Sequence, residues 1–432
     1  MTYFLYNLAL LLLSPAIAIF LLYRIFVSGK SRKSWWQQIG LVRLPKEIDG
    51  RDKIWIHAVS VGESVASAQV ISEIKNALPD AAIVVSTTTE TGQEMARKSI
   101  RDADAFIYYP FDLAPFVSRS IRCVRPRVFA STDTEIWPNF RHIARGLGVK
   151  TTIINGTISD KTIAGARKIP WLYKWTMSNI HLLCMQSQAD ADRAIALGAD
   201  PSNVIVTGNC KADQPADNLS DIEIAELRSQ YKLPANARVF VAGSTNPGED
   251  ASVIEAFIAA RNVYSGLRLI IAPRQIERRE EIADIAREMG LQCGWRSDPA
   301  SISGEEDVLI LDTFGELARV YAIAGASFVG GSLIPRGCHS ILQPISHGKP
   351  VFFGPYTFKA KDLVAQAKAA GVGFEVADGV DLGEKLTYIL GDSARLDDIR
   401  VRCEKMMQAN RGASRRTAEA LVKLYGVSGA VS

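Results

Sequence analysis

The chain has 432 residues, of which 47% are hydrophobic and 22% are charged, with a formal net charge of +4. This composition is ordinary for a globular protein and excludes a mainly disordered chain, while the length allows about two to three domains. No concentrated basic stripe with stacking aromatics occurs, so no nucleic-acid partner is expected. The six cysteines lack Cys-x-x-Cys or zinc-type spacing and are expected to be reduced thiols in a cytosolic compartment.

The first 28 residues differ in kind from the rest of the chain. Residues 3–23 carry no charge, and about 20 apolar residues are enough to cross a bilayer. Basic residues follow this segment at Arg24, Lys30, Arg32 and Lys33. By the positive-inside rule we expect a membrane anchor over residues 1–28, with the bulk of the chain on the cytoplasmic side. The alternative is a monotopic hydrophobic hairpin bent at Pro15, and both arrangements hold the chain at a membrane.

Between residues 29 and 213, apolar runs alternate with helical patterns. This alternation is typical of a doubly wound parallel sheet. Helices are expected at 93–100 and 138–147, among others. The expected strands are 54–59, 82–86, 105–109, 127–131, 151–154, 182–186 and 204–206.

The turn His57-Ala58-Val59-Ser60-Val61-Gly62-Glu63-Ser64 joins the first of these strands to a helical pattern. A strand, a glycine turn and a helix present groups at the carboxyl edge of an α/β sheet. Here the group is the carboxylate of Glu63, which makes it a candidate catalytic base. The alternative is that Glu63 merely caps the helix, satisfying free N–H groups and the positive end of the helix dipole.

More polar groups lie in the same half of the chain. Asp133-Thr134-Glu135 follows the strand at 127–131, so that with Glu63 up to three carboxylates are expected on this side. Lys211 lies at the boundary with the second half, where we expect it to face a cleft. No metal site is expected, because the five histidines lack paired ligand spacing. The Asp190-Ala191-Asp192 pattern is interpreted as a helix cap.

A polar, proline-containing stretch near residues 209–222 predicts a domain boundary. A second alternating series follows, and residues 396–424 are expected to form long helices. Two α/β halves joined by a linker predict a ligand cleft between them. The expected strands of this half are 238–242, 267–271, 292–295, 308–312, 325–329 and 350–353.

Several turns of the second half follow strands and open helices on one edge of the sheet. They are residues 243–250, 273–274, 312–317, 330–332 and 337–344. Together they argue for a nucleotide-sized ligand with its phosphate at helix N-termini, although the lysine of a P-loop is missing. Acidic groups in one half and anion-binding turns in the other suit the transfer of an activated sugar to a hydroxyl.

Taken together, these turns resemble the 3-deoxy-D-manno-octulosonic acid (Kdo) transferases of lipopolysaccharide synthesis. The resemblance covers nearly the whole chain, from the N-terminal anchor to residues 354–358. It implies a GT-B glycosyltransferase of two Rossmann-like domains facing a central cleft, over residues 29–213 for the acceptor and 214–432 for the nucleotide sugar. It also implies inverting transfer of Kdo from CMP-Kdo to a lipid A precursor at the inner membrane, without a metal or other cofactor.

By position in this resemblance, Glu63 would be the general base that activates the acceptor hydroxyl. Lys211 and Asp133 would help to stabilise the transition state. The residues that would hold CMP are Pro273, Arg274, Phe314, Gly315, Glu316, Ser340, Ile341, Leu342 and Gln343.

The chain departs from the usual family pattern at several motif positions. This chain has Asp133 where the family usually has Glu, Thr157 where it has Arg, Gln275 where it has His, Ser340 where it has Asn, Gln343 where it has Glu, Tyr356 where it has His and Lys359 where it has Asn. One alternative is therefore a paralogous membrane-bound glycosyltransferase with a different donor or acceptor. Another is a degenerate membrane-bound scaffold, against which the retention of Glu63, Lys211 and Arg274 argues.

Overall fold

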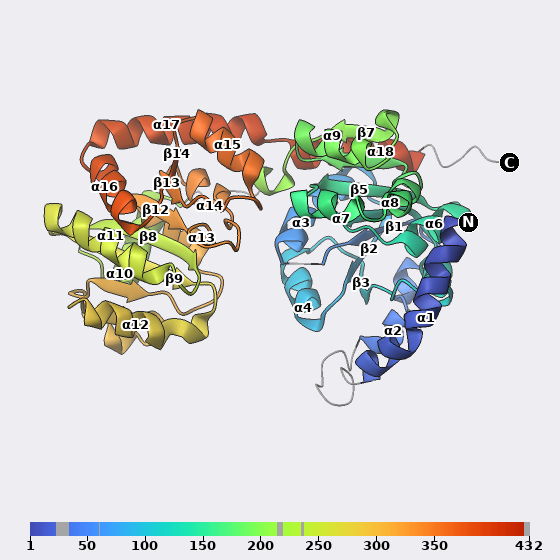
Figure 1. The fold of residues 1–432 in the computed structure, drawn as a ribbon, viewed down its shortest axis with the longest axis horizontal. Helices are drawn as coiled ribbons and strands as arrows, with labels where there is room; N and C mark the ends of the chain where they lie inside the picture. Colours follow the sequence, from blue (N-terminus) through green and yellow to red (C-terminus); the bar gives the residue numbers. More distant parts are fainter. Residues whose placement is uncertain (23–33, 60, 214–218, 235–236, 427–432) are drawn as a thin grey trace. The chain divides into compact units, whose positions relative to one another are not determined.

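The computed structural model describes residues 1–22, 34–59, 61–213, 219–234 and 237–426. It divides into two compact units (Figure 1). Unit 1 comprises Met1–Gln214 together with Asn410–Ser432, and unit 2 comprises Pro215–Ala409.

Unit 1 is built around a parallel sheet of seven strands in the order β3-β2-β1-β4-β5-β6-β7. Its strands are β1 (Lys53–His57), β2 (Ala82–Thr87), β3 (Ala105–Tyr108), β4 (Pro126–Thr132), β5 (Lys150–Gly156), β6 (Leu182–Met185) and β7 (Val204–Val206). Its α-helices are α1 (Thr2–Leu22), α2 (Trp35–Gln38), α3 (Val61–Ala77), α4 (Glu90–Ser99), α5 (Ala114–Val124), α6 (Pro138–Gly146), α7 (Asp160–Ala166), α8 (Pro170–Met177), α9 (Gln188–Ala196) and α18 (Ala413–Gly426).

Both faces of this sheet are buried. Along β1, Ile54 and Ile56 belong to a cluster with Leu421 of α18, whereas Trp55 belongs to a second cluster with Phe140 of α6. Because successive strand side chains point to opposite faces, the two clusters lie on opposite sides of the sheet. Strands buried on both faces are continuous apolar runs, which is why the sequence predicts them well.

Unit 2 repeats this architecture with a parallel sheet in the order β10-β11-β9-β8-β12-β13-β14. Its strands are β8 (Arg238–Thr245), β9 (Leu267–Pro273), β10 (Cys293–Trp295), β11 (Val308–Ile310), β12 (Ala326–Val329), β13 (Val351–Phe353) and β14 (Gly373–Glu375). Its α-helices are α10 (Asp221–Gln230), α11 (Asp250–Val263), α12 (Arg279–Glu288), α13 (Leu317–Val320), α14 (Leu342–Ser346), α15 (Lys361–Ala369), α16 (Gly379–Leu390) and α17 (Ser393–Asn410).

Every expected strand is present, and the expectation of two doubly wound α/β domains is confirmed. Strand β14 was not expected, because its three residues contain only one large apolar side chain. The expected helical stretch at 396–424 is two helices, α17 and α18.

The second of these helices corrects the expected domain division. Residues 214–432 were expected to form one domain, but Asn410–Ser432 group with unit 1. Helix α18 packs its buried Ala418 and Leu421 into the cluster that also contains Val70 of α3. In addition, Asp213 accepts hydrogen bonds from the backbone N–H groups of Gly412 and Ser414, at 2.6 and 2.5 Å. The chain thus returns to unit 1 for its last helix.

The N-terminal helix differs from the expected anchor. Helix α1 is continuous from Thr2 to Leu22 through Pro15, so no hairpin bends there, and residues 23–28 lie outside the described part of the chain. Among the described residues, no helix has the length and apolar character needed to cross a bilayer. Helix α1 instead docks on unit 1: Tyr6 donates to Asp112 at 2.9 Å, and Asn7 exchanges two hydrogen bonds with Asn139, at 2.8 and 3.0 Å. Its first two turns therefore carry polar contacts that an isolated membrane span would lack.

Candidate functional site

Glu63 lies in the first turn of α3, directly after β1, and is 7% exposed. Its Oε2 atom accepts a hydrogen bond of 2.7 Å from the backbone N–H of Val59 and one of 2.6 Å from the hydroxyl of Thr132. The bond to Val59 closes the turn, as the capping interpretation requires. The bond to Thr132, at the end of β4, holds the carboxylate at the carboxyl edge of the sheet, where a base is expected.

Asp133 follows β4 in a left-handed backbone conformation, with φ of +52°. This conformation is costly for a residue other than glycine, and such strain persists where the surroundings enforce it. The Asp133 Oδ1 atom accepts a hydrogen bond of 3.2 Å from the Asn155 side chain. The pKa of Asp133 is raised to about 6, chiefly by desolvation; the charge of Glu63 also raises it, whereas the charge of Lys211 and the Asn155 hydrogen bond lower it.

Glu135 is the third carboxylate of this group. Desolvation, and then the negative charge of Glu63, raise its pKa to about 7. Its backbone carbonyl accepts hydrogen bonds from Ser131 at 3.3 Å and from the fully buried guanidinium of Arg141 at 3.2 Å. The backbone of Glu135 is therefore held rigidly beside the other two carboxylates.

Lys211 lies on a single 3-10 turn, Cys210–Asp213, which follows β7. The Asn155 side chain joins this turn to Asp133, because its Oδ1 atom accepts a hydrogen bond of 2.9 Å from the N–H of Cys210 while its Nδ2 atom donates to Asp133. The structure thus brings Glu63, Asp133 and Lys211 together within unit 1, close enough for their charges to interact.

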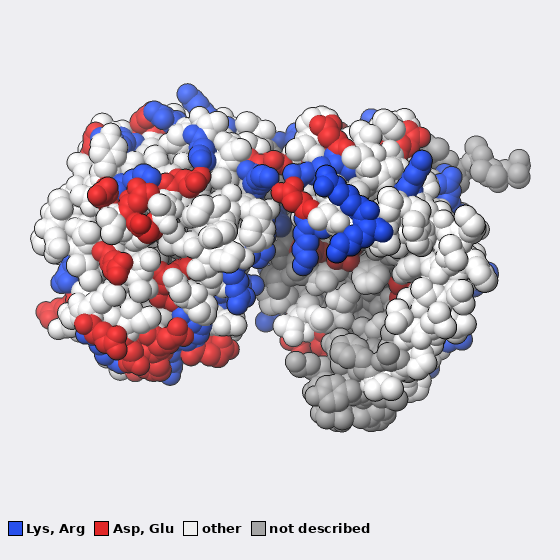
Figure 2. All heavy atoms as spheres, in the orientation of Figure 1, with Lys and Arg blue, Asp and Glu red and all other residues white. Residues whose placement is uncertain are grey.

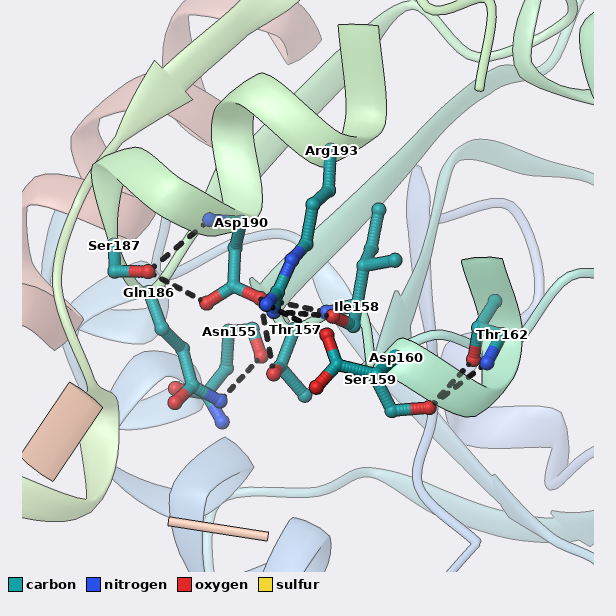
Figure 3. Close-up of polar contacts among 10 residues, drawn as sticks. All are labelled: Asn155, Thr157, Ile158, Ser159, Asp160, Thr162, Gln186, Ser187, Asp190 and Arg193. Atoms are coloured by element: carbon teal, nitrogen blue, oxygen red, sulfur yellow. Dashed lines mark hydrogen bonds and ion pairs between the residues drawn. The ribbon is translucent and has the colours of Figure 1, made fainter. Parts of the chain in front are cut away.

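The loop after β5 contains Thr157, at the position where the related pattern has arginine. Figure 3 shows this loop closed around Asp190 of α9. The Asp190 carboxylate accepts hydrogen bonds from Ile158 N–H at 2.7 Å, from the Thr157 hydroxyl at 3.2 Å and from the Ser187 hydroxyl at 2.8 Å. Asp190 therefore braces the loop against the first turn of α9, but the N-cap of that helix is Ser187, whose hydroxyl accepts a hydrogen bond of 3.2 Å from the N–H of Asp190.

In unit 2, the expected donor residues follow the carboxyl ends of β9, β11 and β12. Arg274 has an exposed side chain, and its N–H donates to the carbonyl of Thr245 at 2.9 Å. Phe314 is 78% exposed, and Gly315 has a φ of +86°, which suits glycine. The Glu316 carboxylate, however, accepts hydrogen bonds from Arg296 at 2.9 Å, Tyr231 at 3.0 Å and Thr313 at 2.5 Å. The Glu316 carboxylate therefore stabilises the turn at residues 312–317 in which it lies.

The turn at residues 340–343 offers fewer side chains than expected. Ile341 and Leu342 are buried, at 0% and 4% exposure, so they pack in the core and leave only their backbone for a ligand. Ser340 is exposed and Gln343 is half-buried. The side chains available to a ligand here are thus those of Ser340 and Gln343. They stand where the related pattern has asparagine and glutamate.

The turn at residues 330–332 is not the open anion cradle that its sequence indicates. The fully buried carboxylate of Glu249 accepts hydrogen bonds from the N–H groups of Gly331, Ser332 and Leu333, at 2.7 to 3.0 Å. It also accepts one from Asn246 N–H at 2.9 Å. An internal carboxylate thus occupies the donors that a phosphate would need, and this contact depends on residues about 80 positions apart.

Positive charge nevertheless gathers at this edge of the sheet. The pKa of His339 is lowered to about 4, first by desolvation and then by the charges of Arg274, Lys359 and Arg336. Arg336, Asn155 and Thr132 were not among the expected site residues, whereas Glu135 was expected only as one of up to three carboxylates on its side, without a role of its own. Glu135 had a signal in the sequence, since it stands in a cluster of carboxylates after a strand. The others depend on contacts between distant segments.

Residues 33–214 match the family model described as 3-deoxy-D-manno-octulosonic-acid transferase (kdotransferase). Over these residues the chain is similar to the Kdo transferase family. The matched segment contains Glu63, Asp133 and Lys211. The family is one of glycosyltransferases, as the expected enzyme class requires.

Two curated relatives and one solved structure illustrate the likeness. The chain is 31% identical to a bifunctional glycosyltransferase/methyltransferase of Fusobacterium nucleatum over 76% of this chain, but it spans only 51% of that protein. It is 28% identical to the 3-deoxy-D-manno-octulosonic acid transferase of Haemophilus influenzae, over 86% of this chain and 87% of the relative. A glycosyltransferase from Rickettsia africae shares the fold, with a TM-score of 0.60, 13% identity and coverage of 89% of this chain and 100% of that one.

Proposed function

We propose that this protein transfers Kdo from CMP-Kdo to a lipid A precursor, with inversion at the reacting carbon. The observation that carries the proposal is the grouping of Glu63 and Lys211 with Asp133, which Asn155 joins to the turn of Lys211, within the segment that matches the Kdo transferase family. A base, a second carboxylate and a cation at one sheet edge are the groups that this transfer requires.

In the proposed reaction, Glu63 takes the proton of an acceptor hydroxyl as its oxygen bonds to the ketose carbon of Kdo. The bond from that carbon to the phosphate oxygen breaks, and CMP leaves with the bonding electrons. One displacement from the opposite side inverts the carbon. Lys211 balances the negative charges of the sugar carboxylate and the departing phosphate, while Asp133 helps to hold Lys211 in place.

The donor is proposed to bind unit 2 through the residues expected from the sequence. Arg274, exposed at the end of β9, supplies a forked cation for phosphate, and Pro273 shapes the same turn. Phe314 and Gly315 offer an exposed ring and an open backbone. Glu316 is proposed to act by holding that turn, since Arg296 and Tyr231 already contact its carboxylate.

We further propose that the protein works at the cytoplasmic face of the inner membrane, with α1 lying on the lipid surface. Exposed apolar side chains on α1 support this, among them Phe4, Leu8, Leu11 and Leu12. Lys and Arg side chains also gather over α7 and α8 on the face drawn in Figure 2. The exposed residues of this region include the basic and apolar side chains of Lys161, Arg167, Lys168, Ile169, Trp171 and Lys174, a mixture that suits anionic headgroups.

A second candidate function is transfer of a different activated sugar, or transfer to a different acceptor, on the same scaffold. The observation that favours it is the set of altered side chains on the donor side, at Ser340, Gln343 and Lys359.

The deciding experiment is an assay of Kdo transfer from CMP-Kdo to a lipid A precursor, using the full chain in detergent. We expect transfer by the wild type and none by Glu63→Ala. If the wild type transfers another activated sugar and not Kdo, the donor assignment is wrong. If Glu63→Ala keeps near-normal activity, the assignment of the base is wrong instead.

A further inference from the structure

Backbone hydrogen bonds join the loops at the carboxyl edge of the unit 2 sheet. Arg274 N–H donates to Thr245 O at 2.9 Å, which ties the loop after β9 to the end of β8. His339 N–H donates to Gly330 O at 3.2 Å, and Cys338 N–H donates to Tyr356 O at 2.8 Å. The segment after β12 also joins β8, through a hydrogen bond of 2.9 Å from Gly330 N–H to Gly243 O, so the segments after β9 and β12 are both tied to β8 and the segment after β13 is tied to that after β12.

Three cations from different segments surround His339 on this surface. Arg274 follows β9, Arg336 follows β12 and Lys359 follows β13, and the charge of each acts on the His339 ring. All three side chains are exposed, and none forms an ion pair within the described part of the chain. His339 is neutral at pH 7, so it neither adds to this charge nor balances it.

Contacts within the loop keep Lys359 close to this group. A methyl group added at Gly337 would lie 2.8 Å from Cγ of Lys359 and 2.7 Å from the ring of Phe358. Gly337 also has a φ of +88°, so glycine is favoured there for its backbone as well as for the space. The aliphatic stem of Lys359 thus packs on the loop that carries Arg336 and His339.

The charge at this edge exceeds the charge that the related pattern supplies. Lys359 stands where that pattern has asparagine, which adds one positive charge, and Gln343 stands where it has an acid, which removes one negative charge. Like charges that lack a partner repel one another, and a bound anion relieves that repulsion. Two changes in the same direction, one in α14 and one in the loop after β13, indicate a ligand with strong negative charge.

We propose that Lys359 is a specificity-determining residue, which completes with Arg274 and Arg336 a three-cation site for an acidic group of the donor. The group is an oxyanion, either the nucleotide phosphate or the carboxylate of the sugar. This inference rests on the proposed role of unit 2 in binding the sugar nucleotide.

The test is calorimetric titration of the full chain in detergent with CMP and with cytidine, which differ only in the phosphate. For a phosphate ligand, Lys359→Asn is expected to weaken CMP binding about tenfold and to leave cytidine binding unchanged, because one charge-assisted contact is lost. Lys359→Arg should keep most of the affinity. Lys405→Asn, the same change at an exposed position of α17, is the matched control and should have no effect on either ligand.

The remaining outcomes are also decisive. If Lys359→Asn leaves CMP binding unchanged but raises the KM for the sugar nucleotide, the site holds the sugar carboxylate. If neither quantity changes in a variant whose Tm matches the wild type, the proposal is overturned. If Lys359→Asn does not fold, loss of CMP affinity in Arg336→Gln, with the affinity kept in Lys359→Arg, supports the site, and unchanged affinity in Arg336→Gln overturns it. If the wild type binds UMP instead of CMP, the proposed donor fails, and the same comparison with UMP and uridine still tests the site.

Discussion

The hydroxyl of Thr132 and the carboxylate of Glu63 approach within 2.6 Å, although 69 residues separate them in the chain. The contact connects the end of β4 to the first turn of α3, and the Thr132 oxygen also lies 3.0 Å from the carbonyl of His57. Thr132 is fully buried, so its hydroxyl has no competing water. A short hydrogen bond to a carboxylate orients the group and stabilises its charged form.

Replacing Thr132 by valine should therefore reduce kcat about tenfold, because the carboxylate of the proposed base loses the hydroxyl that donates to it. The free energy of unfolding should fall by about 1–2 kcal/mol for the same reason. Steady-state transfer kinetics and urea denaturation measure the two effects. Thr132→Ser keeps the hydroxyl and should retain most of the activity. Equal kcat for Thr132→Val and the wild type would show that Glu63 needs no support from β4.

The change Glu63→Gln tests the base with minimal change of shape. We expect kcat to fall about 10²- to 10⁴-fold, which is the usual contribution of a positioned general base. The amide keeps an oxygen for the Val59 N–H, so a residue that only caps the helix should survive this change with little loss of activity. The matched control is Glu73→Gln on the same helix, which should behave as the wild type. Similar kcat values for Glu63→Gln and Glu73→Gln would show that Glu63 caps the helix and is not the base.

Glu135 should make the protein less stable as the pH rises. Its pKa in the folded state is about 7, against an ordinary value of 4.5, so the folded state retains a proton that the unfolded state has already lost. Stability falls with pH where the folded state binds more protons, here between about pH 4.5 and 7. The Tm of Glu135→Gln should consequently decline less over this window than that of the wild type.

The comparison isolates Glu135 from other carboxyls, since the raised pKa values of Asp133 and Asp112 act in both proteins. The exposed Glu94 provides the control substitution, Glu94→Gln, whose Tm profile should follow the wild type. Parallel Tm curves for Glu135→Gln and the wild type would contradict a half-buried carboxyl with a raised pKa.

Asp213 should contribute to stability through the start of α18. Its carboxylate accepts hydrogen bonds from the backbone N–H groups of Gly412 and Ser414, so Asp213→Ala leaves these two donors without this partner. We expect a loss of about 1–2 kcal/mol in unfolding free energy, as for other helix caps, and faster hydrogen exchange across α18. Denaturant titration and exchange mass spectrometry measure these. The control is Asp200→Ala, which removes the cap of a short surface turn. It should leave hydrogen exchange in α18 unchanged.

The strands and the candidate acidic residues could be predicted from the sequence because both depend on local pattern. An apolar run of five residues such as β1 must be buried on both faces, and a carboxylate just after such a strand must lie at the sheet edge. Glu63, Asp133 and Lys211 were expected on these grounds and on the resemblance, and the structure groups them. Their catalytic roles stay predictions.

Other features could not be read from the chain, because they depend on residues far apart in sequence. The sequence of Gly330-Gly331-Ser332 indicates an open anion site, but Glu249 fills it from the start of α11. Asn155 links Asp133 to the turn of Lys211 only because β4, β5 and the segment after β7 converge.

The sequence by itself determined two α/β domains, a list of polar turns and an apolar N-terminal helix, since periodicity and turn residues act over a few positions. The tertiary structure decided which of those turns remain available to a ligand, that α1 docks through Tyr6 and Asn7, and that α18 returns to unit 1. A polar group takes the partner that folding brings within hydrogen-bond distance, and in these three pairs that partner is 69, 82 or 106 residues away.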